Sequence, residues 1–239
     1  MRIEQIGAAT LINADCRVAM AALDSNSVDM VLCDLPYGTT QNKWDTPIPL
    51  APLWEQYRRV CKGAMVLTAS QPFTSAVVAS NYQAFRYAWV WEKGSATGHL
   101  NAHRMPMKLH EDILVFGGTI YNPQDLMPYN KITRRGNSGT NFGDAGKENL
   151  QASTNFPRSI LRFPREGKPV HPTQKPVALM EYLIRTYTDI GMTVLDNCMG
   201  SGSTGVACMN SGRNFIGIEL DEEHGYFDIA CARIRSAVK

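Results

Sequence analysis

Carboxylates stand directly after or at the end of apolar runs in this chain, where they could hold a ligand or a reacting group. Asp34 follows the aliphatic run 28–33, and Leu35, Pro36, Tyr37 and Gly38 come next. An acid beside a rigid proline, an aromatic ring and a permissive glycine could hold a flat, polar substrate. A turn that merely follows a strand is the simpler interpretation of this stretch taken alone. The rest of the chain has to decide between the two.

A glycine-rich segment in the last fifth of the chain predicts a site for a nucleoside-containing ligand. Residues 200–205 read Gly-Ser-Gly-Ser-Thr-Gly and lie between an apolar run that ends at Asp196 and a helical pattern. Glycines let the backbone approach a ligand, and the first turn of a helix presents free N–H groups to it. Glu219 ends the next apolar run, at a spacing that suits an acid holding ribose hydroxyls. The same pattern also fits a nicotinamide-dependent oxidoreductase.

Strand-like and helix-like segments alternate through most of the chain, which predicts an open α/β sheet. Strands are expected at 10–15, 28–33, 64–68, 85–91, 111–116, 193–196 and 215–219, and helices at 16–23, 53–61, 72–78, 177–188, 204–210 and 226–237. A polar loop is expected at 39–49 and another at 94–107. The strands 85–91 and 111–116 have no helix between them and predict an antiparallel edge on a mostly parallel sheet.

The order of these segments predicts a circular permutation. A nucleoside-binding sheet usually continues with one more strand after the strand that holds the ribose, and no such strand follows the last helix. The strand 10–15, which ends on Asp15, can take that place. We therefore expect Asp15 to meet the nucleobase, Glu219 the ribose and Asp34 the reacting end of the ligand.

The segment between the two halves is basic and lacks apolar periodicity. Residues 121–170 hold eight Lys and Arg against four Asp and Glu, an excess of four, although the whole chain has a net charge of only +2. A segment of this length is a functional insertion or is locally disordered. Its cations and amides suit phosphates and base edges, and a solvated basic loop is the competing interpretation.

Composition excludes several classes of protein. Hydrophobic residues make up 44% and charged residues 19% of the chain, as in an ordinary globular domain. No leader pattern and no apolar run of membrane-spanning length is present in the sequence, so we expect a cytoplasmic protein without a membrane. The six cysteines form no C-x-x-C pair and the histidines have no ligand spacing, so we expect free thiols and no metal.

Three motifs resemble those of one enzyme family. Residues 34–37, Asp-Leu-Pro-Tyr, resemble the catalytic D-P-P-Y motif of DNA amino-methyltransferases, and 196–202, Asp-Asn-Cys-Met-Gly-Ser-Gly, are similar to their cofactor motif D-P-F-x-G-S-G. Residues 171–176, His-Pro-Thr-Gln-Lys-Pro, resemble the segment before the cofactor strand. The catalytic motif comes first, which is the order of the beta group. Leu35 replaces the first proline, and Asn197 and Cys198 replace Pro-Phe, but no reacting group is lost.

The resemblance implies a Rossmann-like methyltransferase fold that uses S-adenosylmethionine. Residues 1–118 would form the catalytic half, 119–168 an inserted target-recognition segment, and 169–239 the cofactor-binding half. The catalytic residues would be Asp34, Pro36 and Tyr37. The cofactor would contact Asp15, Asp34, Thr173, Gln174, Lys175, Asp196, Gly200, Gly202, Thr204 and Glu219, and DNA would contact Lys131, Arg134, Arg135, Asn137, Lys147 and Arg158.

The reaction that the resemblance implies is transfer of a methyl group to the N6 amine of adenine in double-stranded DNA, after the base has flipped out of the duplex. An initial Asp in the catalytic motif favours adenine in that family. N4-cytosine methylation is the nearest alternative, an inactive DNA-binding module is a further one, and RNA is a possible substrate. A homodimer and a restriction partner are compatible with the resemblance.

Overall fold

The computed structural model describes residues 1–39, 45–134, 148–167, 170, 173–221 and 224–238. These residues divide into two compact units. The larger unit combines Met1–Asn122 with Ser159–Lys239, and the smaller unit is Pro123–Arg158. The two segments of the larger unit therefore fold together across the insertion.

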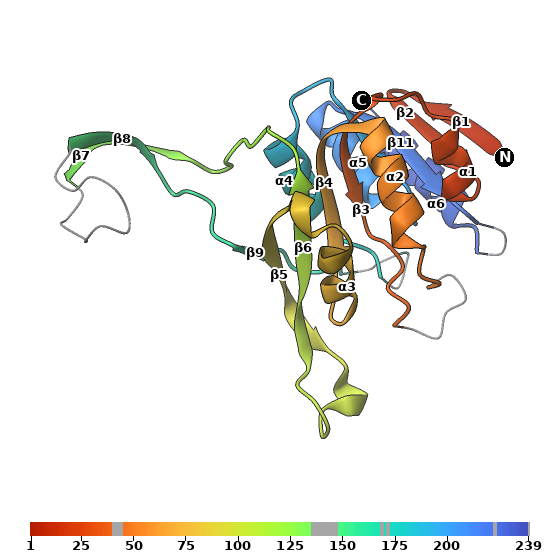
Figure 1. Ribbon diagram of the computed structural model, residues 1–239, viewed down its shortest axis with the longest axis horizontal. Coiled ribbons are helices and arrows are strands. Elements are labelled where there is room, and N and C mark those ends of the chain that lie inside the picture. Colours follow the sequence, from red (N-terminus) through yellow and green to blue (C-terminus); the bar gives the residue numbers. More distant parts are fainter. Residues whose placement is uncertain (40–44, 135–147, 168–169, 171–172, 222–223, 239) are drawn as a thin grey trace. The chain divides into compact units, whose positions relative to one another are not determined.

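A single sheet runs through the larger unit (Figure 1). Among the described residues it has nine strands in the order β1-β2-β11-β10-β3-β4-β6-β5-β9. The strands are β1 (Arg2–Ile6), β2 (Ala9–Asn13), β3 (Val28–Cys33), β4 (Cys61–Ala69), β5 (Phe85–Thr97), β6 (Lys108–Gly117), β9 (Ile160–Arg162), β10 (Thr193–Asp196) and β11 (Asn214–Glu219).

The strand order confirms the predicted permutation. β2 pairs in parallel with β11, so the N-terminal strand extends the sheet beside the strand that ends at Glu219. β10 pairs in parallel with β3, which brings the strand ending at Asp196 beside the one that precedes Asp34. β4, β6 and β5 form the expected antiparallel edge. Two strands were not predicted: β1, which pairs antiparallel with β2, and β9, which pairs in parallel with β5.

Helices cover both faces of the sheet. They are α1 (Cys16–Ala21), α2 (Leu50–Val60), α3 (Phe73–Ser80), α4 (Val177–Tyr187), α5 (Ser203–Ser211) and α6 (Tyr226–Ala237). Successive side chains of a strand point to opposite faces. In β3, Met30 and Leu32 join the buried cluster formed with α4, α5 and α6, whereas Val31 and Cys33 join the cluster formed with α1, α2 and α3. The run 28–33, which is apolar apart from Asp29, therefore reflects a strand that is buried on both faces.

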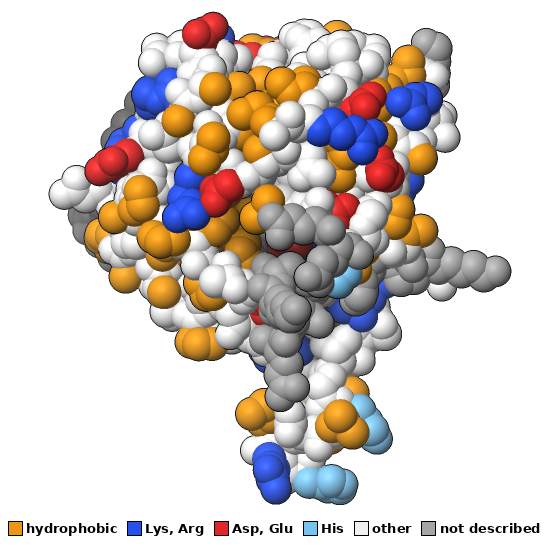
Figure 2. Space-filling model, turned by 90° about the vertical axis from the view of Figure 1, so that its right-hand side faces the viewer, with side chains coloured by type: hydrophobic (Ala, Val, Ile, Leu, Met, Phe, Trp, Pro, Cys, Tyr) orange, Lys and Arg blue, Asp and Glu red, His pale blue; other side chains and the backbone are white. Residues whose placement is uncertain are grey.

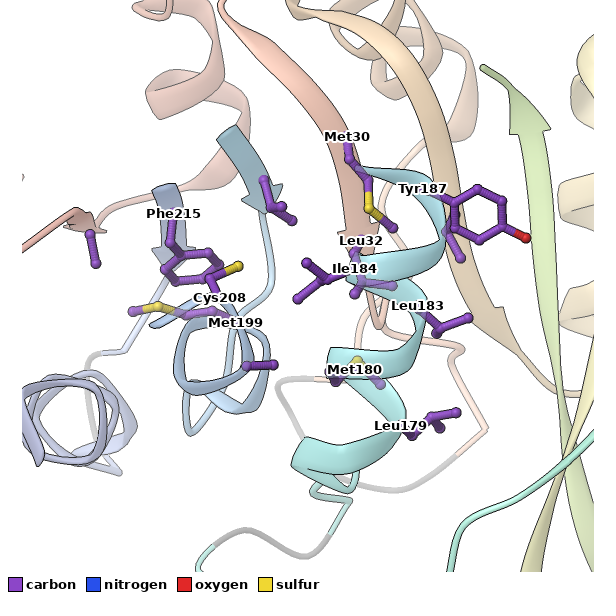
Figure 3. Packing of buried hydrophobic residues seen from close by; sticks show 14 of the residues in the cluster. Met30, Leu32, Leu179, Met180, Leu183, Ile184, Tyr187, Met199, Cys208 and Phe215 are labelled. Atoms are coloured by element: carbon purple, nitrogen blue, oxygen red, sulfur yellow. The ribbon is translucent and has the colours of Figure 1, made fainter. Parts of the chain in front are cut away.

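Figure 3 shows the first of these clusters, in which the apolar side of α4 faces β3. Leu183 and Ile184 are fully buried there, as is Phe215 of β11 apart from 1% of its surface. This packing fixes the two halves of the larger unit to each other and so holds the ends of β3, β10 and β11 in one place.

The β5–β6 hairpin is longer than the sequence pattern predicted. β5 continues to Thr97, so residues 94–97 of the expected loop 94–107 are strand, and β6 begins at Lys108, three residues before the expected strand 111–116. A short 3-10 turn at His99–Asn101 lies near the tip. The hairpin projects from the body of the larger unit (Figures 1 and 2). Its tip carries Leu100, which is 97% exposed, and residues 94–110 contain no Asp or Glu.

The smaller unit is a β-hairpin of β7 (Met127–Arg134) and β8 (Glu148–Thr154), paired antiparallel. It is shorter than the predicted insertion 119–168, because β9 and the residues after it belong to the larger unit. No helix in the described ranges is long and apolar enough to cross a membrane. Nor do those ranges contain a group of three His, Cys, Asp or Glu placed to hold a metal.

Candidate active site

A cavity of about 850 Å³ lies in the larger unit at the carboxyl ends of β2, β3, β10 and β11. Such crevices are where ligands bind in open α/β sheets. Nearly all the predicted catalytic and cofactor residues line it: Asp15, Asp34, Pro36, Tyr37, Thr173, Gln174, Lys175, Asp196, Gly200, Thr204 and Glu219. Segments that are far apart in the sequence thus meet at one site.

The carboxylate of Asp34 is held by three side chains. The hydroxyls of Tyr37 and Thr68 both lie at hydrogen-bond distance from Oδ1, that of Tyr37 at 2.8 Å. Nζ of Lys175 donates to Oδ2 at 2.5 Å. Asp34 keeps 27% of its side chain exposed, so the carboxylate still reaches the cavity. These contacts fix both the orientation and the charge partner of Asp34.

Tyr37 and Lys175 serve Asp34 in ways that the motif alone did not predict. The Tyr37 ring stacks on Phe73, with centroids 5.2 Å apart, so one face of the ring is covered. Burial raises the pKa of Tyr37 well above its usual value, and its hydroxyl stays protonated. Burial by itself lowers the pKa of Lys175, but the carboxylates of Asp34 and Glu111 outweigh that effect and the pKa is raised. Lys175 is therefore cationic.

The backbone after the motif is held by Asp45. The N–H groups of Gly38 and Thr39 both donate to its carboxylate, each at 2.9 Å. Gly38 has a φ of +68°, and a Cβ there would lie 2.6 Å from Cγ of Pro47. The turn therefore requires glycine at position 38 both for its conformation and for space.

The glycine-rich turn is built around Glu219 and Asp196. The N–H of Gly200 donates to Oε2 of Glu219 at 2.7 Å. The Thr204 hydroxyl donates to Asp196 at 2.6 Å, and the N–H of Cys198 donates to it at 3.1 Å. Burial raises the pKa of Asp196 to about 6 and that of Glu219 to about 7. Asp196 thus shapes the turn, while Glu219 both holds the turn and lines the cavity.

Gly202 does not line the cavity. Its φ is +80°, and a Cβ there would meet Cβ of Ala230 at 3.0 Å and Cδ1 of Ile234 at 3.2 Å. The second glycine of the motif therefore lets α6 pack closely against the start of α5. This is the packing role that one glycine of a nucleoside-binding turn commonly takes.

Two other predicted ligand residues are engaged with neighbouring protein groups. Asp15 accepts the N–H of Arg17 at 2.8 Å as the N-cap of α1, and the Arg17 side chain holds its pKa below the usual value. Gln174 donates to Glu166 and accepts the N–H of Val170 at 3.0 Å. Both residues still line the cavity.

Three residues near Asp34 were missed by sequence reasoning: Thr68, Lys93 and Glu111. Thr68 is a buried threonine near the end of the otherwise apolar second half of β4. A polar side chain at the end of a core strand is the signal that could have identified it. Lys93 and Glu111 lie on β5 and β6 and form an ion pair of 3.1 Å. No sequence pattern marks them, since they meet only through the antiparallel pairing of those strands.

The predicted DNA-contacting residues lie in or beside the smaller unit. Lys131 and Arg158 are exposed. Arg134 ends β7, and Arg135, Asn137 and Lys147 lie outside the described residues.

The fold and the cavity together define an α/β protein with a ligand crevice at its strand ends and a fixed carboxylate, that of Asp34, in the crevice wall. The chain matches the family model described as DNA methylase over residues 28–230, and it belongs to that family. It is 29% identical over 226 residues to YubD of Escherichia coli (strain K12), covering 89% of this chain and 85% of the relative. It is 26% identical to the type II methyltransferase M.HpaI of Haemophilus parainfluenzae, covering 95% of this chain and 74% of that enzyme.

Solved structures resemble the chain along nearly its whole length. The M1.HpyAVI-SAM complex is 27% identical, with a TM-score of 0.64 that covers 94% of this chain and 99% of that chain. The PvuII cytosine-N4-specific DNA methyltransferase has a TM-score of 0.70 over 97% of this chain and 90% of that one. At 12% identity the PvuII likeness concerns the fold alone. The chain is thus a DNA amino-methyltransferase with the predicted Rossmann-like fold.

Proposed function

We propose that this chain transfers a methyl group to the exocyclic N6 amine of adenine in DNA. Methylation of an exocyclic amine in DNA follows from the family, and S-adenosylmethionine is the cofactor. The observation that carries the residue assignment is the carboxylate of Asp34, which is held by Thr68, Tyr37 and Lys175 at the edge of the cavity.

The cavity fits the cofactor. Glu219, Gly200 and Asp34 all line it, and its volume of about 850 Å³ lies in the range of cofactor sites. Glu219 would accept the ribose hydroxyls, Gly200 would let the backbone approach, and Asp15 would face the nucleobase. S-adenosylmethionine supplies an electrophilic methyl group on a sulfonium centre.

Asp34 and Pro36 would prepare the amine of the target base. The lone pair of an exocyclic amine is delocalised into the ring, so the amine is a poor nucleophile. The carboxylate of Asp34 and the backbone carbonyl of Pro36 would each accept one N–H bond, which turns the nitrogen toward tetrahedral geometry and aims its lone pair along the line of attack. Because Lys175 already neutralises Asp34, this carboxylate is suited to accept hydrogen bonds and need not be a strong base.

The base has to leave the duplex to reach the cavity. Tyr37 would then meet the base with the part of its ring that Phe73 leaves free. The exposed cations Lys131 and Arg158, together with Arg134, Arg135, Asn137 and Lys147, would contact DNA. The β5–β6 hairpin would add a second DNA-contacting surface, in the same unit as the cavity. Thr97 and Lys108 at its base line the cavity, and its tip contains no acidic residue that would repel phosphates.

The choice of adenine rests on Asp34 as the first residue of the catalytic motif. N4-cytosine methylation is an equally available outcome, since both amines can donate to Asp34 and Pro36. Nucleoside analysis of DNA methylated by the purified protein separates the two. N6-methyladenine supports the proposal, and N4-methylcytosine replaces it.

The role of Asp34 is tested with Asp34→Ala and, as a control, Asp24→Ala on the exposed surface. Asp34→Ala should abolish methyl transfer, while binding of S-adenosylmethionine measured by calorimetry stays close to that of the unmodified protein. Near-normal activity in Asp34→Ala would overturn the catalytic assignment.

The DNA contacts are tested by salt dependence. Lys131→Ala and Arg158→Ala combined should weaken DNA binding and reduce the slope of log affinity against log salt by about 2, since each phosphate contact contributes about one counterion. An unchanged slope would remove both residues from the interface.

A further inference from the structure

A buried pair of opposite charges, Glu111 and Lys93, adjoins Lys175, which also contacts Asp34. Nζ of Lys175 is 3.3 Å from Oε2 of Glu111, and Oε1 of Glu111 is 3.1 Å from Nζ of Lys93. The exposed fractions of the side chains are 8% for Lys175, 14% for Glu111 and 3% for Lys93. Together with Asp34 they form a chain of four alternating charges along the cavity.

Three separate parts of the fold supply this chain of charges. Lys93 lies on β5 and Glu111 on β6, at the place where the antiparallel hairpin leaves the sheet. Lys175 comes from the turn before α4 and is separated from Asp34 by 141 residues in the sequence. Because Lys93, Glu111 and Lys175 all line the cavity, the chain of charges forms part of its wall.

The charges of the four side chains balance, which makes each one depend on the others. A buried ion is stable only when its partners compensate the lost hydration, so removing one member leaves an uncompensated charge. Oε2 of Glu111 accepts no hydrogen bond from the described residues and faces Lys175 at ion-pair distance. Glu111 therefore holds the ammonium group of Lys175 by charge, while Lys93 holds Glu111.

The cost of burying two lysines points to a role beyond the tethering of strands. An apolar pair would join β5 to β6 at a lower desolvation cost. The Asp34 carboxylate, by contrast, has to keep one orientation in a partly buried site, and a fixed cation at Oδ2 both holds and balances it. Lys175 can supply that cation only if Glu111 compensates its second side.

We propose that the Lys93–Glu111 ion pair positions Lys175 and, through it, the catalytic carboxylate of Asp34 for methyl transfer. This inference rests on the proposed catalytic role of Asp34. It assigns Lys93 and Glu111 as positioning residues, which act on the target base only through Lys175 and Asp34. It also assigns Lys175 to the methyl-acceptor end of the cavity, in place of the cofactor contact that the motif predicted.

Opposite changes of charge in the pair should move the pH dependence of the reaction in opposite directions. Glu111→Gln removes a negative charge beside Lys175, which favours negative charge at that end of the cavity, so the acidic limb of kcat/KM should move down. Lys93→Met leaves two carboxylates to share Lys175, so the limb should move up. Shifts of up to about one pH unit are expected from a charge at this distance. The other titratable groups near Asp34, namely Tyr37, Cys33 and Asp196, are unchanged in both variants.

The experiment measures kcat, KM for S-adenosylmethionine and the pH profile for Glu111→Gln, Lys93→Met and the double variant. Each single variant should lower kcat by roughly 10-fold, in the range seen for residues that orient a reacting group, with KM for the cofactor changed by less than about 2-fold. The double variant restores charge balance, so the acidic limb of its pH profile should return to that of the unmodified protein. It still lacks the ion pair that positions Lys175, so its kcat should stay lowered by roughly 10-fold. Lys93→Arg keeps the charge and should retain most of the activity.

Two outcomes overturn the inference: limbs that move in the same direction or not at all in the single variants, and a double variant with the kcat of the unmodified protein. If Lys93→Met fails to fold, the isosteric Glu111→Gln decides alone through the downward movement of its limb. Full activity of Asp34→Ala would instead refute the proposed function. An inactive Asp34→Ala with unaffected Glu111→Gln and Lys93→Met would refute only this inference.

Discussion

Replacing Glu219 by glutamine should stabilise the ligand-free protein at alkaline pH while weakening cofactor binding. Burial raises the pKa of Glu219 from 4.5 to about 7, because the site disfavours its charged form. A carboxyl group whose folded-state pKa lies above its unfolded-state value weakens the fold as pH rises past the unfolded value, and the loss is complete above the folded value. The loss for Glu219 therefore begins near pH 4.5 and is complete above about pH 7.

The size of this loss follows from the same pKa change. At about 1.4 kcal/mol per pH unit, the rise to about 7 corresponds to an upper limit of about 3 kcal/mol. A glutamine side chain in place of Glu219 would still offer an oxygen to the N–H of Gly200, so that 2.7 Å contact is kept. Glu219→Gln should accordingly raise the free energy of unfolding by about 1–3 kcal/mol at pH 8 and by much less at pH 5.

The cofactor affinity should change in the opposite sense. Hydrogen bonds from ribose hydroxyls to a carboxylate are roughly twice as strong as those to a neutral amide, so affinity should fall by roughly 10-fold at pH 8. Urea unfolding at both pH values and calorimetry with S-adenosylmethionine provide the two measurements. Glu55→Gln, on the exposed side of α2, is the matched control and should change neither.

Two results would refute this reasoning. If Glu219→Gln destabilises the protein equally at pH 5 and pH 8, the carboxylate is not disfavoured by burial. If the affinity for S-adenosylmethionine does not change, Glu219 does not hold the ribose.

Three further substitutions test the packing and the projecting hairpin. Gly202→Ala should lower the thermal unfolding temperature more than Gly212→Ala does. Both glycines have a positive φ, but only a Cβ at position 202 would lie as close as 3.0 Å to α6, so equal losses would contradict the packing role of Gly202. Leu100→Ala should change the free energy of unfolding by less than about 0.5 kcal/mol but weaken DNA binding in a fluorescence titration. The control Ile190→Ala, at a side chain 80% exposed between α4 and β10, should change neither quantity. Equal DNA affinity of the two variants would exclude the hairpin tip from the DNA interface. Leu183→Ala, at a fully buried position, should cost about 2–5 kcal/mol in urea unfolding, and a loss below about 1 kcal/mol would contradict the described core.

Much of the fold could be predicted because strands buried on both faces are continuous apolar runs. Residues 28–33 and 193–196 were placed correctly for this reason, and the permuted order followed from the positions of their terminal acids. β1 and β9 were missed. β1 has only one buried residue and β9 only three residues, so neither shows an apolar run that could be recognised before its partner strand is known.

The site was predicted in part for a similar reason. Asp34, Asp196 and Glu219 lie at or directly after the ends of strands. Their place at the ligand-binding edge of the sheet can be predicted from the order of residues along the chain. The roles of their neighbours were not readable. Gly202 turned toward α6, and Lys175 turned toward Asp34, since both outcomes depend on which helix or strand lies opposite.

The sequence by itself determined the α/β class, the permuted arrangement and the family, because these depend on local apolar patterns and on short motifs in a fixed order. Only the tertiary structure decided how Asp34 is held. Its partners Thr68, Lys175 and, through Lys175, Glu111 and Lys93 come from four distant segments. Buried charges have to be compensated in space, and the residues that compensate them need no relation along the chain.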